Sequence, residues 1–244
     1  MSKKLKIAII GSRGYPYVYS GYETLVKELA ERLVKSGNEV TVYCHSKLFN
    51  KKPKKVNGVH LVYTPSVRSK VFSQLYNSLF SFIHVCFSKS DVVLVVNSAN
   101  GPFGLLTKIF RKKTCINVDG LEWLRPKWKG LGSIYFKWAS KMATIFYDQI
   151  ISDSEEMRKV YLKLFNIDSK VIAYGGNIRK SINPSLIKKF KLNIRDYYLV
   201  IGRLIPDNNA NLIIKGFLNS NSIKKLVIVG DVPYSDPYSK KIKK

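Results

Sequence analysis

The sequence contains few acidic residues, cysteines or histidines, and each shortage excludes a class of site. Only 16 Asp and Glu stand against 42 Lys and Arg, which leaves a net charge of +26. The three cysteines and three histidines have no metal-ligand spacing among them, so we expect no metal site. An odd number of well-separated cysteines also favours free thiols. The composition therefore predicts a metal-free protein of the reducing cytoplasm.

Long hydrophobic runs are missing as well. The amino terminus has an apolar run only over residues 7–10 before Gly11, too short for a signal peptide or a membrane-spanning helix. The glycines that follow, Gly11, Gly14 and Gly21, are too far apart for the G-x-G-x-x-G dinucleotide fingerprint, and no G-x-S-x-G motif occurs. Nicotinamide-dependent enzymes and serine hydrolases are thus disfavoured, and we expect no cofactor.

Short runs rich in β-branched residues alternate with longer amphipathic stretches. The runs cover residues 5–10, 39–44, 59–63, 92–96, 114–118, 149–152 and 170–173. Most are continuously apolar, which is typical of parallel strands covered on both faces. We therefore predict a doubly wound, Rossmann-like α/β domain. Its first helix should begin at a capping pair, Ser20 and Glu23, and end at Gly37.

The character of the sequence changes after Tyr174. A polar, basic stretch containing Gly175, Gly176 and Pro184 predicts a connection between domains. A strand, a helix and a second strand then follow over residues 197–230, with no further pattern over 234–244. We predict three parts: an amino-terminal domain at 1–180, a linker at 181–196, and the start of a second Rossmann-like domain at 197–244. One β-α-β unit is too small to bury its own faces.

The positive charge is spread almost evenly. Its excess is +8, +7, +6 and +5 in residues 1–60, 61–130, 131–193 and 194–244. A nucleic-acid-binding tail would concentrate such charge, whereas an even distribution suits a protein that works at an anionic membrane surface. Solvated lysines without a partner would give the same pattern. We expect a membrane partner and no nucleic acid, and nucleic-acid binding is the competing interpretation, which rests on the charge alone.

A helix predicted over residues 71–88 is amphipathic. Its apolar face holds Phe72, Leu75, Leu79, Ile83 and Cys86, and its polar face holds Ser73, Asn77, Ser81 and Ser88. Either the apolar face packs into the core, or it faces a membrane with Arg68, Lys70 and Lys89 beside it. A lysine cluster over residues 47–55 likewise suits a solvated loop or a lipid contact.

Two segments carry residues suited to binding. Gly14 and Gly21 lie in the loop before the first helix, where they either shape a turn or let a phosphate approach the helix amides. The segment 117–130 follows a strand and combines carboxylates, cations and aromatic rings. Its candidates are Asp119, Glu122, Trp123, Arg125, Lys127 and Trp128. These types suit base catalysis, hydroxyl binding and stacking on a sugar, or else form a packed aromatic lid.

Several stretches together resemble a known family. GSRGYPYVYSGYETLVKELAERL, VDGLEWLRPKW, ISDSEEMRKVY, AYGG and GRLIPDNNANLIIKGF are similar to family 4 glycosyltransferases of the two-Rossmann-domain (GT-B) class. Within that class they resemble the group that includes rhamnosyltransferases of capsule and cell-wall polysaccharide assembly. The resemblance implies metal-independent transfer with retention of anomeric configuration. It also implies a nucleotide-sugar donor such as dTDP-rhamnose and a sugar acceptor on a polyprenyl diphosphate.

The same resemblance implies roles for individual residues. Asp119 and Glu122 would be catalytic, and Trp123, Arg125, Lys127 and Trp128 would bind the acceptor. Gly14, Gly21 and Arg203 would bind the donor. The family usually has a lysine five residues after the arginine, but this chain has Asn208.

Nothing after Gly230 resembles the acidic region that holds the donor sugar in the family. We therefore expect a glycosyltransferase, peripheral at the inner membrane face, whose donor-side domain is truncated in this chain and completed by a separate half. The alternative is a non-catalytic fragment that binds only acceptor or membrane.

Overall fold

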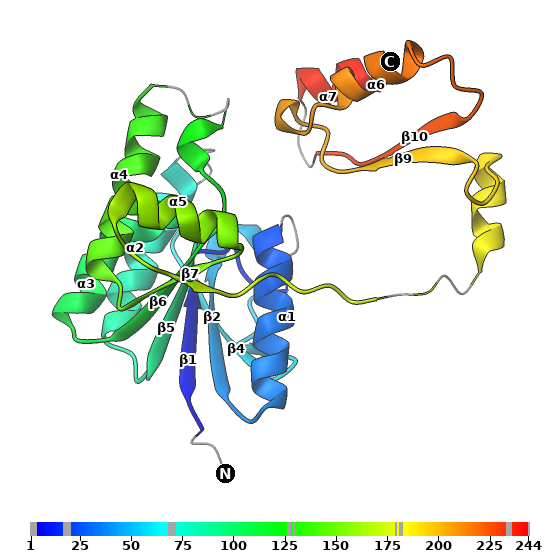
Figure 1. Ribbon diagram of the computed structural model, residues 1–244. Coiled ribbons are helices and arrows are strands. Elements are labelled where there is room, and N and C mark those ends of the chain that lie inside the picture. The colour runs from blue at the N-terminus through cyan, green and yellow to red at the C-terminus, as the bar shows by residue number, and fades with distance from the viewer. Residues whose placement is uncertain are drawn as a thin grey trace. The chain divides into compact units, whose positions relative to one another are not determined.

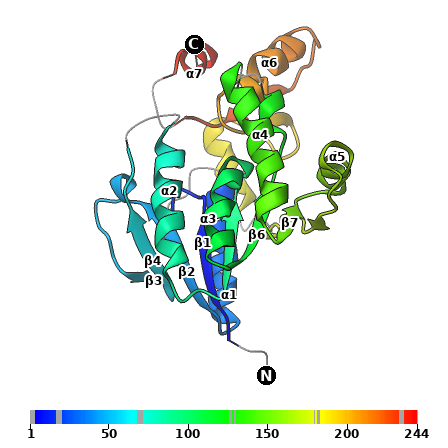
Figure 2. The ribbon, with the colours of Figure 1, turned by 90° about the vertical axis from the view of Figure 1, so that its left-hand side faces the viewer.

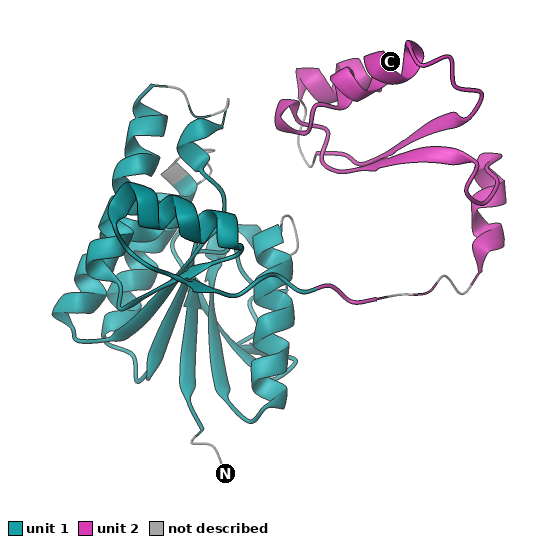
Figure 3. Ribbon diagram, in the orientation of Figure 1, with its two compact units in different colours: residues 1–175 teal, residues 176–244 magenta. Residues whose placement is uncertain are grey.

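The structure is a computed structural model that describes residues 4–16, 21–67, 72–125, 128, 130–178, 180, 183–232 and 236–243. The chain divides into two compact units, residues 1–175 and residues 176–244 (Figure 3). The division falls ahead of the boundary expected at residue 180.

An eight-stranded sheet forms the centre of the first unit, in the order β3-β4-β2-β1-β5-β6-β7-β8 (Figure 1). Its strands are β1 Lys6–Ile10, β2 Glu39–His45, β3 Lys55–Val56, β4 Val59–Thr64, β5 Val92–Val96, β6 Lys113–Val118, β7 Gln149–Ser152 and β8 Lys170–Val171. All neighbours are parallel except β3 and β4. Because β1 lies between β2 and β5, the strand order reverses beside β1, where open α/β sheets place their ligands.

Helices cover both faces of this sheet. They are α1 Gly21–Lys35, α2 Phe72–Cys86, α3 Gly104–Ile109, α4 Leu131–Phe146 and α5 Glu155–Phe165, with short 3-10 helices η1 Ser46–Leu48, η2 Ser98–Phe103 and η3 Glu122–Leu124. Figures 1 and 2 show α1 on one face and α2, α3 and α4 side by side on the other. The predicted doubly wound α/β fold is confirmed.

The strand β1 shows why the sequence folds in this way. Successive side chains of a strand point to opposite faces. Ala8 and Ile10 accordingly join one buried cluster, with Phe82 of α2, and Ile9 joins the other, with Val26 of α1. Since both faces are buried, an uninterrupted apolar run is the stable sequence here.

The first helix begins at Gly21, directly after Ser20, and ends as predicted. Gly37 adopts φ +87°, a conformation that favours glycine, and its amide donates to the carbonyl of Val34. Ser20 lies outside the described residues. Glu23 is buried, and its Oε1 accepts a hydrogen bond from the backbone amide of Arg13 at 3.1 Å. This contact ties α1 to the loop after β1.

The helix α2 buries part of its polar face as well as part of its apolar face. The polar side chains of Asn77 and Ser81 are buried, whereas Leu79 and Ile83 are 38% and 43% exposed. The physical reason is hydrogen bonding to β4: Asn77 Nδ2 donates to Thr64 Oγ1 at 2.8 Å, and Ser81 Oγ lies 2.8 Å from the same oxygen. Of the two interpretations left open for this apolar face, packing into the core applies to Cys86, whereas Leu79 and Ile83 remain at the surface.

The second unit contains, among its described residues, a two-stranded parallel sheet and four helical segments. Its elements are η4 Pro184–Phe190, β9 Tyr197–Ile201, η5 Pro206–Asn208, α6 Ala210–Leu218, β10 Lys225–Val229 and α7 Pro237–Ile242. The helix α7 was not predicted, although Asp236 caps it by accepting from the amide of Ser239 at 3.0 Å. Apolar side chains on β9 remain open to solvent, among them Ile201 at 73% exposure.

Candidate active site

The loop after β1 needs its glycines for structural reasons. Gly11 has φ +103°, and a Cβ there would stand 2.1 Å from the carbonyl oxygen of Val96. Gly14 has φ +129°, and a Cβ would meet Cys44 at 2.9 Å. Gly21, the first residue of α1, has no described atom within 4 Å of an added Cβ. Of the two predicted donor-binding glycines, Gly14 is thus required by packing, and Gly21 has space for a ligand.

Asp119 lies at the carboxyl end of β6, where two tyrosines contact it. Tyr22, in the first turn of α1, donates its hydroxyl to Asp119 Oδ1. Tyr174 donates to Asp119 Oδ2 at 3.3 Å and to Asn117 Oδ1 at 2.7 Å. The three segments are distant in sequence, and the carboxylate is where they meet.

The environment of Asp119 changes its acidity. The pKa of its carboxyl is raised from 3.8 to about 6, mainly by burial and also by the nearby charges of Asp153 and Glu122. Arg125 and the hydrogen bond from Tyr174 act in the opposite direction. Burial, with the charges of Asp119 and Asp153, also raises the pKa of the Tyr174 hydroxyl. A carboxyl with a pKa near neutrality is a frequent feature of functional sites.

Asp153, Tyr22, Tyr174 and Asn117 were not among the predicted site residues. A signal for Asp153 was available, because it directly follows β7 as Asp119 directly follows β6. Parallel strands end at the same edge of a sheet, so two such aspartates should face one cleft. The tyrosines carry no comparable signal, since each reaches the site through the tertiary fold.

Glu122 holds the loop together. One carboxylate oxygen accepts from Trp128 Nε1 at 2.7 Å, and the other lies 3.0 Å from Arg125 Nη1. Gly120, at φ +72°, allows Arg125 to fold back, because a Cβ there would stand 3.0 Å from its guanidinium. These contacts favour a positioning role for Glu122. Lys127 lies outside the described residues.

The two described tryptophans of the loop differ in burial. Trp123 packs with Ala99 and Phe136 in a buried cluster, and its backbone carbonyl accepts from Ser133 Oγ at 2.7 Å. The packed-lid interpretation thus applies to Trp123. Trp128 packs at 4.8 Å from the ring of Phe136 but stays partly exposed. Of the two predicted aromatic contacts, Trp128 therefore has the more exposed ring, which a ligand could stack on.

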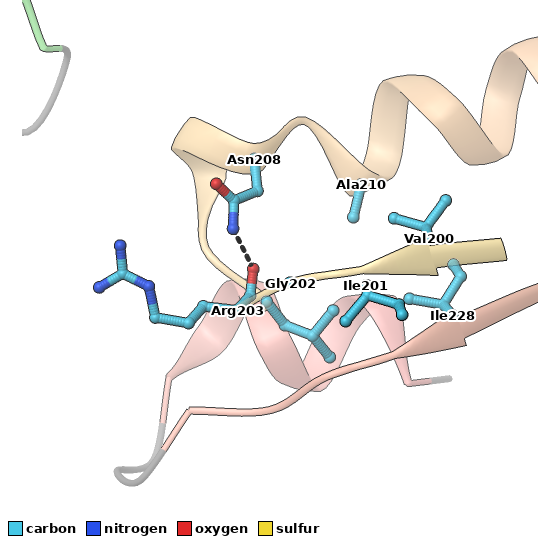
Figure 4. A pocket seen from close by; sticks show the side chains of 8 residues that line it. Val200, Ile201, Gly202, Arg203, Asn208, Ala210 and Ile228 are labelled. Carbon is cyan, nitrogen blue, oxygen red and sulfur yellow. Dashed lines mark hydrogen bonds between the residues drawn. The ribbon is translucent and has the colours of Figure 1, made fainter. Parts of the chain in front are cut away.

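The second unit has a hollow of about 250 Å³ at the carboxyl end of β9 (Figure 4). Its lining residues are Val200, Ile201, Gly202, Arg203, Leu204, Asn208, Ala210 and Ile228. Asn208 Nδ2 donates to the carbonyl oxygen of Arg203 at 2.8 Å and so shapes the turn before α6. Figure 4 shows the Arg203 guanidinium extending beyond the strand, away from the apolar lining. The start of α6 and this cation offer an anion two favourable contacts.

The described part of the chain contains no group of three or more His, Cys, Asp or Glu that could hold a metal ion. All three cysteines are free. Burial raises the pKa of the Cys44 thiol to about 12 and that of Cys115 to about 11, so neither is a reactive thiolate near neutral pH.

Comparisons with known proteins identify a family and a fold. A family model described as "Domain of unknown function (DUF1972)" matches residues 4–177. No curated protein matches the sequence. Sucrose-phosphate synthase from Thermosynechococcus elongatus is similar in structure, with a TM-score of 0.74, 14% identity, and coverage of 98% of this chain and 66% of that one.

Two further solved structures share the fold. HepE from Anabaena, in complex with UDP and glucose, has a TM-score of 0.71 at 14% identity and covers 98% of this chain and 65% of its own. UGT89C1 from Arabidopsis thaliana, in complex with UDP-L-rhamnose, has a TM-score of 0.53 at 15% identity, with coverage of 97% and 67%. At such identities the likeness shows the fold, which is GT-B. The chain spans about two thirds of the length of these structures.

Proposed function

Because this chain belongs to the DUF1972 family and folds like GT-B glycosyltransferases, we propose that it transfers a sugar from a nucleotide donor to an acceptor hydroxyl. The observation that carries the proposal is the Asp119 carboxylate. It is held by two tyrosines at the sheet edge where this fold binds ligands, and its pKa is raised to about 6.

Asp119 is suited to orient an acceptor hydroxyl. Each carboxylate oxygen has two lone pairs, so an oxygen that already accepts from a tyrosine can accept one more hydrogen bond. Tyr22 and Tyr174 fix the orientation of the carboxylate. Above a pH of about 6 the group is mostly ionised and can polarise the acceptor O–H bond. Arg125 and Trp128 lie on the same loop, beside the acceptor position that we propose.

The second unit supplies the donor contacts in this proposal. Departure of a nucleoside diphosphate builds negative charge on its phosphates, and fixed cations and helix amides stabilise that charge. Arg203 and the start of α6 flank the hollow at the end of β9 and provide such groups. Asn208 stands where the resembled glycosyltransferases usually have a lysine, so the proposed diphosphate site has one fewer cation.

The finer assignment follows the sequence resemblance. We propose dTDP-rhamnose as donor and a sugar on a polyprenyl diphosphate as acceptor, with retention of configuration and without a metal. The complex of UGT89C1 with UDP-L-rhamnose supports the view that this fold accommodates a rhamnose nucleotide. The even positive charge supports work at the anionic inner face of the membrane.

The second unit needs a further partner segment in this proposal. Ile201, Leu212 and Leu218 are 73%, 65% and 70% exposed, which a complete Rossmann-like domain would bury. We propose that additional donor-side polypeptide covers them, and that the 244-residue chain alone does not transfer sugar. The second candidate function is binding of acceptor or membrane without catalysis. The same exposed side chains favour it, because they belong to a donor-side unit that lacks a complete core.

The test is a transfer assay with radiolabelled dTDP-, UDP- and GDP-sugars and a polyprenyl-diphosphate-linked sugar acceptor. The chain is assayed alone and with a polypeptide that completes the donor-side domain. We expect product only in the completed form. Absence of transfer from every nucleotide-sugar in the completed form would contradict the enzymatic proposal and leave the binding function.

A matched pair of variants tests the site. Asp119→Asn should reduce transfer by roughly 100-fold or more, as for loss of an acid-base group. Asp168→Asn is the control, because Asp168 is an exposed partner of Arg158 on the surface. Equal transfer by both variants would remove Asp119 from the active site.

A further inference from the structure

Three neighbouring helices of the first unit, α2, α3 and α4, contain no acidic residue. Figure 2 shows α2, α3 and α4 side by side over the sheet, and their sequences hold no Asp or Glu. The opposite face is covered by α1, which carries Glu23, Glu28 and Glu31. The helix α5, which joins the same buried cluster as α2 through Met157 and Tyr161, carries Glu155 and Glu156, so the acid-free surface is limited to α2, α3 and α4.

The acid-free helices also expose many large apolar side chains. On these helices, or directly after them, the following are more than a third exposed: Tyr76, Leu79, Ile83, Phe87, Leu105, Ile109, Phe110, Leu131, Ile134, Trp138 and Ile145. We call this surface the α2–α3–α4 face. Soluble monomers rarely expose so many contiguous apolar groups without a function for them.

The face is continuous across the three helices. The rings of Phe87 and Phe110, at the ends of α2 and α3, lie 5.0 Å apart. Lys108 Nζ on α3 donates to the carbonyl oxygen of Ile145 on α4 at 2.8 Å. At the other end, Leu131 begins α4 and is 85% exposed. This end follows the loop that carries Glu122 and Trp128, so the apolar surface reaches the candidate site.

The charges and residue types indicate what covers this face. Lys108, Arg111, Lys137 and Lys141 are exposed on or beside it. An anionic lipid surface complements these cations, whereas a second copy of a chain with net charge +26 would add repulsion. Tyr76 and Trp138 combine an apolar ring with a polar atom, as side chains at a membrane-water interface do.

We propose that the α2–α3–α4 face docks on an anionic lipid bilayer, with its apolar side chains inserted at the interface and its lysines among the headgroups. No helix in the described part of the chain is long and apolar enough to cross a membrane. The helices accordingly lie along the surface in this proposal. Docking by this face is independent of the proposed transfer reaction, because it is measured with lipid alone.

The experiment uses the full chain and two kinds of vesicle. One is phosphatidylcholine, and the other contains roughly a third of phosphatidylglycerol, which supplies the negative charge that attracts lysine. We expect co-sedimentation with anionic vesicles at about 0.1 M salt and release at about 1 M, where charges are screened within about 3 Å. Replacing Lys137 and Lys141 by Gln should weaken binding by roughly 30-fold.

Matched double variants locate the contact. Ile109→Ser with Ile134→Ser removes two apolar groups that are each 65% exposed on the face. Leu162→Ser with Leu164→Ser removes two on α5 that are 46% and 47% exposed and lie outside it. Vesicle binding should fall by roughly tenfold or more only in the first variant, since interfacial binding depends on inserted apolar area. Circular dichroism confirms that both variants are folded.

Tryptophan fluorescence supplies a second measurement. Trp138 is 48% exposed on the face, whereas Trp123 is buried. Lipids with brominated acyl chains should quench the wild-type protein, and Trp138→Phe should reduce that quenching, with the remainder from the partly exposed Trp128. The proposal is overturned if the wild-type chain does not bind anionic vesicles at low salt, or if both double variants bind equally. A face variant that instead converts a dimer into a monomer would assign the surface to a second copy.

Discussion

Asp119 should make the protein less stable as its carboxyl ionises. Its folded-state pKa of about 6 lies above the value of 3.8 expected in the unfolded chain, so folding favours the protonated form. The penalty is absent below the unfolded value, grows between these two pKa values, and is complete above the folded one. At about 1.36 kcal/mol per pKa unit, the ionised group destabilises the fold by about 3 kcal/mol.

The substitution Asp119→Asn removes this penalty while keeping the shape of the side chain. The hydrogen bonds with Tyr22 and Tyr174 must rearrange in the variant, which should lower its free energy of unfolding by about 1 kcal/mol at every pH. The variant should therefore be slightly less stable than the wild type near a pH of about 4 and about 2 kcal/mol more stable near a pH of about 8. For a domain of this size, that gain corresponds to roughly 4–8 °C in melting temperature.

The assay is urea unfolding of both proteins across this pH range, followed by circular dichroism. The difference in unfolding free energy should change by about 3 kcal/mol between the two limits, whatever its constant offset. Asp168→Asn is the control with the opposite sign, because Arg158 lowers the pKa of Asp168 and the exposed pair stabilises slightly at neutral pH. A pH-independent difference for Asp119→Asn would refute the burial argument.

Three further predictions concern single side chains. Tyr174→Phe removes a hydrogen bond that lowers the Asp119 pKa, so the acid limb of the pH profile of transfer by the completed enzyme should move to higher pH; an unmoved profile would separate Tyr174 from the site. Arg203→Ala should weaken binding of a nucleoside diphosphate by roughly 10- to 150-fold in calorimetry, the value of one charged contact. Trp123→Ala should destabilise the first unit by about 3–5 kcal/mol in urea unfolding, because it empties part of a buried cluster. A loss below about 1 kcal/mol would contradict that packing role.

Most of the sheet was predictable because burial on both faces imposes a simple sequence rule. Strands such as β1 and β5 are continuously apolar and short, and few other structures accept such runs between amphipathic helices. The helix α7 was missed because six residues rich in lysine show no periodicity, and its cap at Asp236 became evident only with the helix in place.

The candidate site was predictable only where a residue follows a strand directly. Asp119 was found in this way, and Asp153 could have been. The resemblance implies a catalytic role for Glu122, and the structure adds its contacts with Trp128 and Arg125, which hold the loop. Whether a carboxylate acts on a substrate or holds a loop depends on its side-chain contacts in the folded protein, and the sequence alone does not give these contacts.

The sequence by itself determined the class of fold and the strand end at which Asp119 lies, because both follow from local hydrophobicity and chain direction. The tertiary structure alone decided the neighbours of Asp119, since Tyr22 and Tyr174 are 97 and 55 residues away in the chain. It also decided which side of α2 is buried. Helical periodicity defines two faces, but the choice between them depended on Thr64 of β4, which satisfies Asn77 and Ser81 and so leaves Leu79 and Ile83 at the surface.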